Sequence, residues 1–166
     1  AMLALAKIYA RDRKVAVRTQ SAGMLSFAYQ PNSYDLIVSE FTLHHLPDFW
    51  KAVALARIFA ALKPGANFYL RDIVFVSGPD GVERDVEQWA DFTIKNHEFE
   101  HEAVVTHMRD EYSTFGWVIE RMLTDVGFTL EHDGRRALSV PPGESRADRV
   151  AALTDRALVE NSVAID

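Results

Sequence analysis

The sequence predicts an α/β fold in which strands alternate with helices and the sheet is mostly parallel. The apolar run Leu36-Ile37-Val38 is typical of a strand that is buried on both faces of a parallel sheet. A helix-period pattern follows over 47–62 and ends at Lys63-Pro64-Gly65. A second strand-like run then covers 68–76. These three observations describe a strand-helix-strand unit, whose two strands lie parallel in one sheet.

The residues before this unit predict a helix, a short strand and a loop. Apolar residues recur at helical spacing close to the start, namely at Met2, Leu5, Ile8 and Tyr9. The alternation around Val15 and Val17 predicts a strand over 15–18. Glycine, proline, asparagine and serine then predict a loop over 21–33, which leads into the strand at 34–41.

The residues after the unit continue the alternation of helices and strands. Gly78-Pro79-Asp80-Gly81 predicts a break before a helix with a shared apolar face of Val86, Trp89, Ala90 and Ile94. A further helix is expected from Phe115 to Val126, with an N-cap at Ser113 or Thr114 and Gly127 just past its end. A strand begins at Phe128.

Composition bounds the class of protein. The 166 residues are 48% hydrophobic and 25% charged, which is ordinary for one globular domain. A net charge of -6 gives no basic footprint, so we expect no nucleic-acid partner. No apolar run has the length of a membrane span, so we expect no membrane partner. The absence of cysteine excludes disulfides and thiolate metal sites and is compatible with a reducing compartment, and a cytoplasmic location is expected.

The motifs, taken together, resemble those of class I S-adenosylmethionine-dependent methyltransferases of the small-molecule type. The resemblance covers roughly residues 2–131 and depends on a combined signal of YDLIVS, LHHLPD, LKPG and DVGF in this order. It implies a Rossmann-like methyltransferase fold with strand order 3-2-1-4-5-7-6, S-adenosylmethionine as the cofactor and a small-molecule methyl acceptor. A short antiparallel seventh strand is expected over 136–140. The domain then covers 1–140, and 141–166 form a C-terminal tail with an amphipathic helix.

The family's glycine-rich turn is not found in this sequence. No GxG occurs, so we expect the chain to lack the first two strands of the fold and the glycine-rich loop. The strands predicted over 15–18 and 34–41 would be the third and fourth of the family, about 14 Å apart at ~4.8 Å per strand spacing. Their facing edges would expose unpaired backbone groups. An incomplete fragment, a non-catalytic remnant or interaction subunit, and a homodimer that covers the exposed edges all stay open.

The resemblance also implies where the cofactor binds. In open α/β sheets, ligands bind beyond the carboxyl ends of the strands at the point where strand order reverses. The segment after the strand at 34–41 is expected to face the methionine end of the cofactor, through Ser39, Glu40, Phe41 and His44. The adenine end is expected to lie against Ser21, Ala22, Gly23 and Met24, with Met2 lining the same pocket.

Three residues are the predicted catalytic set. Methyl transfer needs in-line placement, exclusion of water and sometimes a base for the acceptor. His44, Asp72 and Tyr112 are this set. His107, Arg109 and Glu111, which share the segment HMRDEYST with Tyr112, are further candidate bases or substrate ligands. Asp72 is alternatively a partner of Arg71 or a helix cap, and HMRDEYST is either a substrate lid or a solvated loop. His45 either packs its loop or touches a ligand.

A competing motif is the literal HExxH at His97, Glu98 and His101. In zinc proteases, two such histidines bind zinc and the glutamate is the general base, with a third ligand where His107 stands. Val104 occupies the position where that pattern has glycine, and a β-branched residue fits a positive φ poorly. The predicted site therefore contains no metal ligand, and a zinc site at HEFEH stays a minor alternative.

Overall fold

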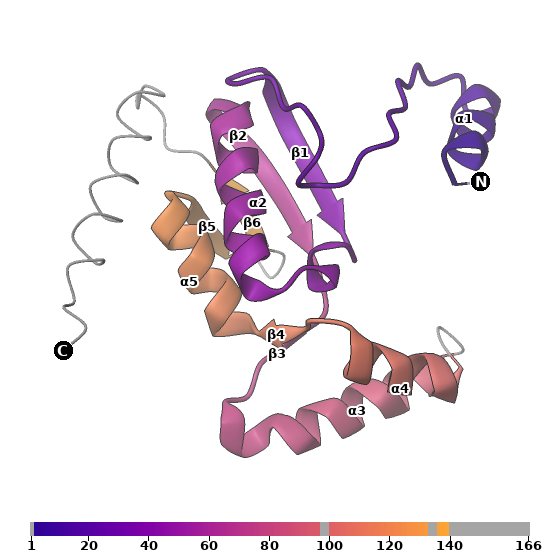
Figure 1. Cartoon of the computed structure of the whole chain (residues 1–166), viewed down its shortest axis with the longest axis vertical. Helices are drawn as coiled ribbons and strands as arrows, with labels where there is room; N and C mark the ends of the chain where they lie inside the picture. Colours follow the sequence, from indigo (N-terminus) through magenta and orange to yellow (C-terminus); the bar gives the residue numbers. More distant parts are fainter. Residues whose placement is uncertain (1, 97–99, 133–135, 140–166) are drawn as a thin grey trace.

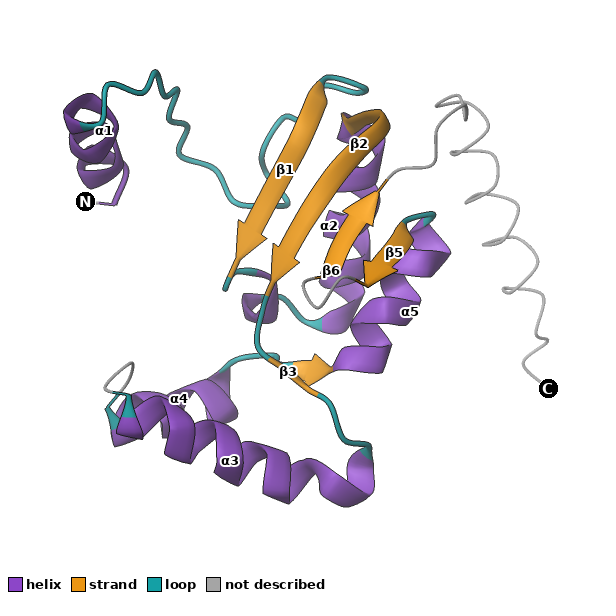
Figure 2. Ribbon diagram, turned by 180° about the vertical axis from the view of Figure 1, so that it is seen from behind, coloured by secondary structure: helices purple, strands orange, loops and turns teal. Residues whose placement is uncertain are grey.

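The computed structural model describes residues 2–96, 100–132 and 136–139, which form a sheet with two helices packed on one face (Figure 1). The sheet contains β1 (Tyr34–Glu40), β2 (Leu62–Arg71), β5 (Thr129–His132) and β6 (Arg136–Ser139). Helices α2 (Asp48–Ala61) and α5 (Gly116–Val126) lie behind the strands in the reverse view (Figure 2). The other face of the described sheet carries no helix in that view.

The strand order is β1-β2-β6-β5. β1 pairs with β2 in parallel, whereas β6 is antiparallel to both β2 and β5, so three strands share one direction and β6 alone opposes them. This order is the 4-5-7-6 part of the order that the resemblance implies. The prediction of a mostly parallel α/β sheet and of an antiparallel strand from Arg136 is therefore confirmed.

The core lies between the sheet and the two helices. α2 presents Leu55, Ile58 and Phe59, each at most 2% exposed. They pack with Phe68 of β2 and with Phe128, which follows α5, and the Phe59 and Phe128 rings meet edge to face at 4.9 Å. The predicted apolar face of α2 is thus the face that it buries, and this apolar contact fixes the helix on β2.

A second group of elements lies beyond the carboxyl ends of β1 and β2 (Figure 1). The short strands β3 (Val74–Phe75) and β4 (Thr114–Phe115) pair in parallel. Between them the chain forms η2 (Pro79–Gly81), α3 (Val82–Lys95) and α4 (His101–Asp110). This insertion returns the chain to the end of the sheet at 111–113, which is where the site lies.

The predicted strand over 15–18 is wrong. α1 (Met2–Asp12) forms as predicted but buries no residue, and the segment after it has no strand, with Val15 and Val17 more than half exposed. A strand needs a neighbour for its backbone groups, and in the family order the third strand is not adjacent to the fourth. The expectation that 36–38 is buried on both faces is also wrong. Leu36 and Val38 are each 56% exposed, because no described helix covers their face of the sheet.

Other boundaries differ by a few residues. α2 ends at Ala61, and β2 starts at once because Leu62 already pairs with Tyr34. The predicted strand over 68–76 is divided into β2 and β3. α5 has Phe115 as its N-cap because Thr114 is held in β4. The segment HMRDEYST is not one loop, since its first four residues end α4.

The half-buried face of α3 and the left-handed Gly127 are confirmed, with φ of +113° at Gly127. Residues 141–166, with the predicted tail helix, lie outside the described residues. Among the helices that the structure describes, none has the length and apolarity needed to cross a bilayer.

We expect Gly127→Ala to destabilise the fold by about 2–5 kcal/mol. A Cβ there would stand 2.8 Å from Cζ of Phe59, in addition to the strain of positive φ. Gly65→Ala is the matched control, because Gly65 also has positive φ (+78°) but a Cβ would meet nothing within 4 Å, so about 1–2 kcal/mol is expected. Urea unfolding measures both, and equal losses would contradict the packing argument.

Candidate functional site

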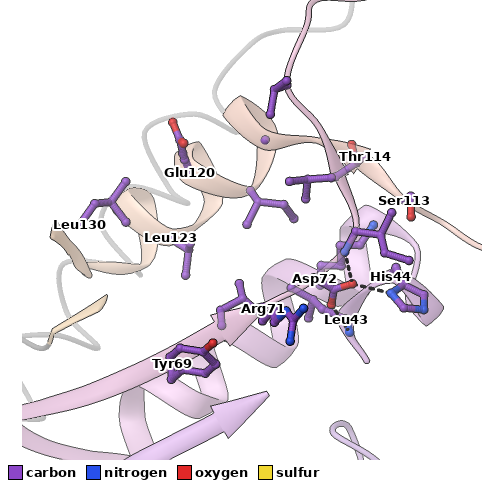
Figure 3. Close-up of a pocket in the computed structure, with 17 residues that line it drawn as sticks. Leu43, His44, Tyr69, Arg71, Asp72, Ser113, Thr114, Glu120, Leu123 and Leu130 are labelled. Atoms are coloured by element: carbon purple, nitrogen blue, oxygen red, sulfur yellow. Dashed lines mark hydrogen bonds and ion pairs between the residues drawn. The ribbon is translucent and has the colours of Figure 1, made fainter. Parts of the chain in front are cut away.

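The candidate site lies where the chain leaves β1 and β2 at the same edge of the sheet. His44 comes from the short 3-10 helix η1 (Leu43–His45) that follows β1, and Asp72 directly follows β2. Both residues line an open cavity of about 790 Å³ (Figure 3). Because neighbouring parallel strands end at one edge, two residues 28 positions apart meet there.

Asp72 connects the two strand ends. Its Oδ2 accepts a hydrogen bond from the Leu43 backbone N–H at 2.7 Å, and its Oδ1 accepts one from the Ile73 N–H at 2.8 Å. Oδ1 also contacts His44 Nδ1. An ionised carboxylate only accepts hydrogen bonds, so Nδ1 of His44 carries the hydrogen. This fixes the ring, and Nε2 faces away from Asp72.

Glu111 stands at the centre of a histidine cluster. Its Oε2 lies 3.3 Å from His44 Nε2 and also contacts His107 Nδ1, while Oε1 lies 3.7 Å from His45 Nδ1. His107 Nε2 is 2.8 Å from Ser113 Oγ. His44 and His107 are 5% and 8% exposed. Burial lowers the pKa of His107, and the charge of Glu111 opposes this shift, so the cluster favours a neutral His107 ring.

A second open cavity, of about 840 Å³, adjoins this cluster. Its lining includes His44, His45, His107 and Glu111 together with Trp89 and Phe41. The Trp89 ring packs on His107 at 4.9 Å between centroids. His44 lines both cavities, so the cluster forms part of the boundary between them.

Lys51 holds the 111–113 segment against α2. Only 1% exposed, it donates from Nζ to Asp48 Oδ1 at 2.7 Å and to the Tyr112 carbonyl. The Tyr112 N–H in turn donates to the His44 carbonyl at 2.8 Å. These backbone contacts place Glu111 opposite His44.

The predicted catalytic residues are only partly brought together. His44 and Asp72 are in contact, as described. Tyr112 contributes backbone atoms, but its side chain is half exposed and lines neither cavity. Asp72 does not pair with Arg71, which lies 3.7 Å from Glu40 and over the Phe41 ring. Of the alternatives for Asp72, the helix cap fits, since it accepts from the first residue of η1.

The predicted methionine-end residues stand at the end of β1. Ser39 is buried, and its Oγ has no hydrogen-bond partner among the described residues. Glu40 and Phe41 are exposed, and Phe41 has a positive φ of 48°.

The predicted adenine-end residues are not brought to this edge. Met2 is 78% exposed on α1, which stands apart from the sheet in Figures 1 and 2. Gly23 begins a turn closed by Ser26, and Met24 packs against the core. Neither Met2 nor any residue of 21–24 lines the two cavities, so their cofactor roles stay predictions.

The zinc-protease alternative gains no support in the described part of the chain. His97 and Glu98 lie outside the described residues. His101 is exposed on α4, and His107 faces Glu111 and His44 instead. Sequence reasoning missed Lys51, although it shares a helical stripe with Leu55 and Ile58, and a lysine on an apolar stripe is an available signal.

Comparison with known proteins finds methyltransferases that are similar to parts of this chain. A family model described as a methyltransferase domain matches residues 1–65. The 27-O-demethylrifamycin SV methyltransferase of Amycolatopsis mediterranei is 30% identical over 82 residues, covering 49% of this chain and 29% of that protein. The crystal structure of a SAM-dependent methyltransferase from Methanosarcina mazei matches with 18% identity and a TM-score of 0.53, covering 83% of this chain and 76% of that one. The described residues thus share the fold of a SAM-dependent methyltransferase, and residues 1–65 match the methyltransferase-domain model.

A protein of another kind also matches part of this chain. This chain is 59% identical over 61 residues to the DNA mismatch repair protein MutL of Rhizorhabdus wittichii. The match covers 35% of this chain and 10% of MutL. The chain thus spans a tenth of MutL and less than a third of the curated methyltransferase above. The MutL likeness concerns one segment, whereas the structural match covers most of the chain.

We expect Lys51→Met to destabilise the fold by about 1–3 kcal/mol, because the Tyr112 carbonyl and Asp48 lose a donor at a part-buried position. Lys63→Met is the control, since the Lys63 to Asp35 pair at 2.7 Å is exposed and is worth less than about 1 kcal/mol. Chemical denaturation compares the two. Equal effects would show that the 111–113 segment does not depend on Lys51.

Proposed function

We propose that this chain provides the acceptor side of an S-adenosylmethionine-dependent methyltransferase that acts on a small molecule. The observation that supports this most directly is the pair of His44 and Asp72 at adjoining ends of β1 and β2, inside an open cavity. This is the edge where α/β folds bind ligands. The methyl acceptor of this chain is assigned here only by class.

The cavities have the character of small-molecule sites. Each is near 800 Å³, within the usual range of ligand pockets. Apolar side chains predominate in the lining of the first cavity, whereas polar and charged residues predominate in that of the second. The cluster of His44, His107 and Glu111 supplies the polar atoms. We assign this cluster to hold the nucleophilic atom of the acceptor, and Trp89 and Ile73 to exclude water beside it.

The cofactor, when bound, supplies an already activated methyl group. The chain's own task is then placement. Ser39 fits the cofactor's methionine end in one respect, since its buried hydroxyl lacks a partner at the end of β1. The 21–24 segment offers no cavity wall for the adenine, so the described residues fit the cofactor on one side only.

A second candidate function is that of a non-catalytic methyltransferase-like subunit. The exposed apolar residues Leu36 and Val38 on the free face of β1 favour it, because such a face suits an interaction. We propose a second copy of this chain as the partner there. The net charge of -6 argues against a nucleic-acid partner. A cytoplasmic location and the lack of a membrane partner stay part of the proposal.

Calorimetric titration with S-adenosylmethionine separates the two functions. Binding is expected, and Ser39→Ala should weaken it by roughly 5- to 10-fold through loss of one hydrogen bond. Thr93→Val is the matched control, because Thr93 Oγ1 is the other buried hydroxyl without a partner among the described residues and lies on α3. The absence of heat at millimolar cofactor would contradict cofactor binding by this chain and favour the non-catalytic subunit.

Methyl transfer is tested with a panel of small phenols, alcohols, carboxylic acids and amines, with formation of the demethylated cofactor as the readout. Asp72→Asn should lower the rate with any accepted compound by about 10- to 100-fold, since the amide cannot accept from both His44 and the backbone donors. Asp110→Asn is the control on an exposed aspartate. If both variants are as active as the natural chain, Asp72 has no positioning role.

A further inference from the structure

We propose that His44, His107 and Glu111 form a binding site for a divalent transition metal ion, with Zn²⁺ as the representative ion. The inference rests on the proposed function and deepens it: the three side chains would bind the metal, and the metal would bind the nucleophilic atom of the acceptor. The binding itself does not depend on methyl transfer.

The geometry of the three side chains suits one ion. Each of the three offers one ligand atom, and these atoms all lie within 4.8 Å of one another. Oε2 of Glu111 faces both Nε2 of His44 and Nδ1 of His107. Two ligands bound to zinc at about 2.0–2.1 Å in tetrahedral geometry stand about 3.3 Å apart. His44 Nε2 and Glu111 Oε2 are 3.3 Å apart already. Modest side-chain rotation therefore brings the three atoms around one centre.

The groups behind these ligands also match a metal site. Histidines that bind metals usually donate their other ring N–H to a carboxylate, carbonyl or hydroxyl. His44 donates from Nδ1 to Asp72, which leaves Nε2 with a free lone pair. His107 has Ser113 Oγ at 2.8 Å from Nε2, and its Nδ1 contacts Glu111, so a metal ion would bind Nδ1 by displacing the hydrogen between these two groups. Each histidine thus presents the nitrogen that faces Glu111, and each is supported on the opposite side.

Ligand type and openness define the class of ion. Two imidazoles and a carboxylate suit Zn²⁺, Fe²⁺, Co²⁺ or Ni²⁺ better than Mg²⁺ or Ca²⁺, which take oxygen ligands. Three protein ligands leave at least one coordination position open, as in catalytic zinc sites. All three side chains line the 840 Å³ cavity, which gives an oxygen or nitrogen atom of a small molecule room beside them.

The proposed site differs from the HExxH alternative. It uses His107 but neither His97 nor His101, and its other ligands come from η1 and from the residue after α4. His101 stands on the same helix as His107 but is exposed. It therefore provides a control that removes one histidine from α4 without touching the cluster.

The test is calorimetric titration of the chelator-stripped full chain with ZnCl₂, with Co²⁺ absorption spectra as a second probe of coordination. One ion per chain is expected. Glu111→Gln and His107→Ala should each weaken binding by about 100-fold or more, and Asp72→Asn by about 10- to 100-fold. His101→Ala should leave binding unchanged. Circular dichroism of each metal-free variant checks that the variant folds. If His107→Ala does not fold, Glu111→Gln alone carries the test, because it keeps the shape of the side chain.

Each outcome decides the proposal separately from the enzyme function. Absence of stoichiometric binding, or binding that survives Glu111→Gln and His107→Ala, overturns the metal site. Loss of binding in His101→Ala overturns it as well and moves the metal to the surface of α4. Cofactor titration of the metal-free chain is measured in parallel, so a chain that binds S-adenosylmethionine but no metal keeps the proposed function and loses only this inference.

Discussion

The Asp72 carboxylate is the interaction on which the site depends. It receives the backbone N–H groups of Leu43 and Ile73 and the ring of His44 at the point where β1 and β2 release the chain. A buried carboxylate is costly unless its oxygens are hydrogen-bonded, and here each oxygen has a donor. The same bonds that satisfy the charge therefore fix the start of η1 and the ring of His44. The local fold and the functional geometry have one cause.

The rest of the cluster reaches this edge through the insertion between β3 and β4. Pairing of these two short strands returns the chain after α4, and Lys51 and the His44 carbonyl then hold the Tyr112 backbone. Glu111 is next to this anchor, so its carboxylate is delivered to three histidines from two distant segments. Rigid placement by backbone contacts is what a ligand-binding constellation needs. Tyr112 matters here for its main chain rather than for its ring.

The sequence correctly predicted those elements whose formation depends mainly on residues close together in the chain. The apolar stripe of α2, the left-handed Gly127 and the strand before LHHLPD needed only neighbours in sequence, and the topology of parallel strands then placed His44 and Asp72 at one edge. The strand over 15–18 failed because a strand is defined by its partner. The meeting of Glu111 with His44 could not be predicted, because it depends on the length of α3 and α4 and on the pairing of β3 with β4.

The two sides of the site differ in how firmly they are held. The acceptor side rests on β2 and α2, whose side chains form the packed core. The cofactor side rests on β1, whose Leu36 and Val38 are exposed and whose outer edge is unpaired in the described sheet. A ligand or partner that binds only the ordered form of β1 stabilises it by mass action. The cluster around Glu111 depends on both sides, because His44 follows β1 through η1 while Asp72 at the end of β2 holds its ring.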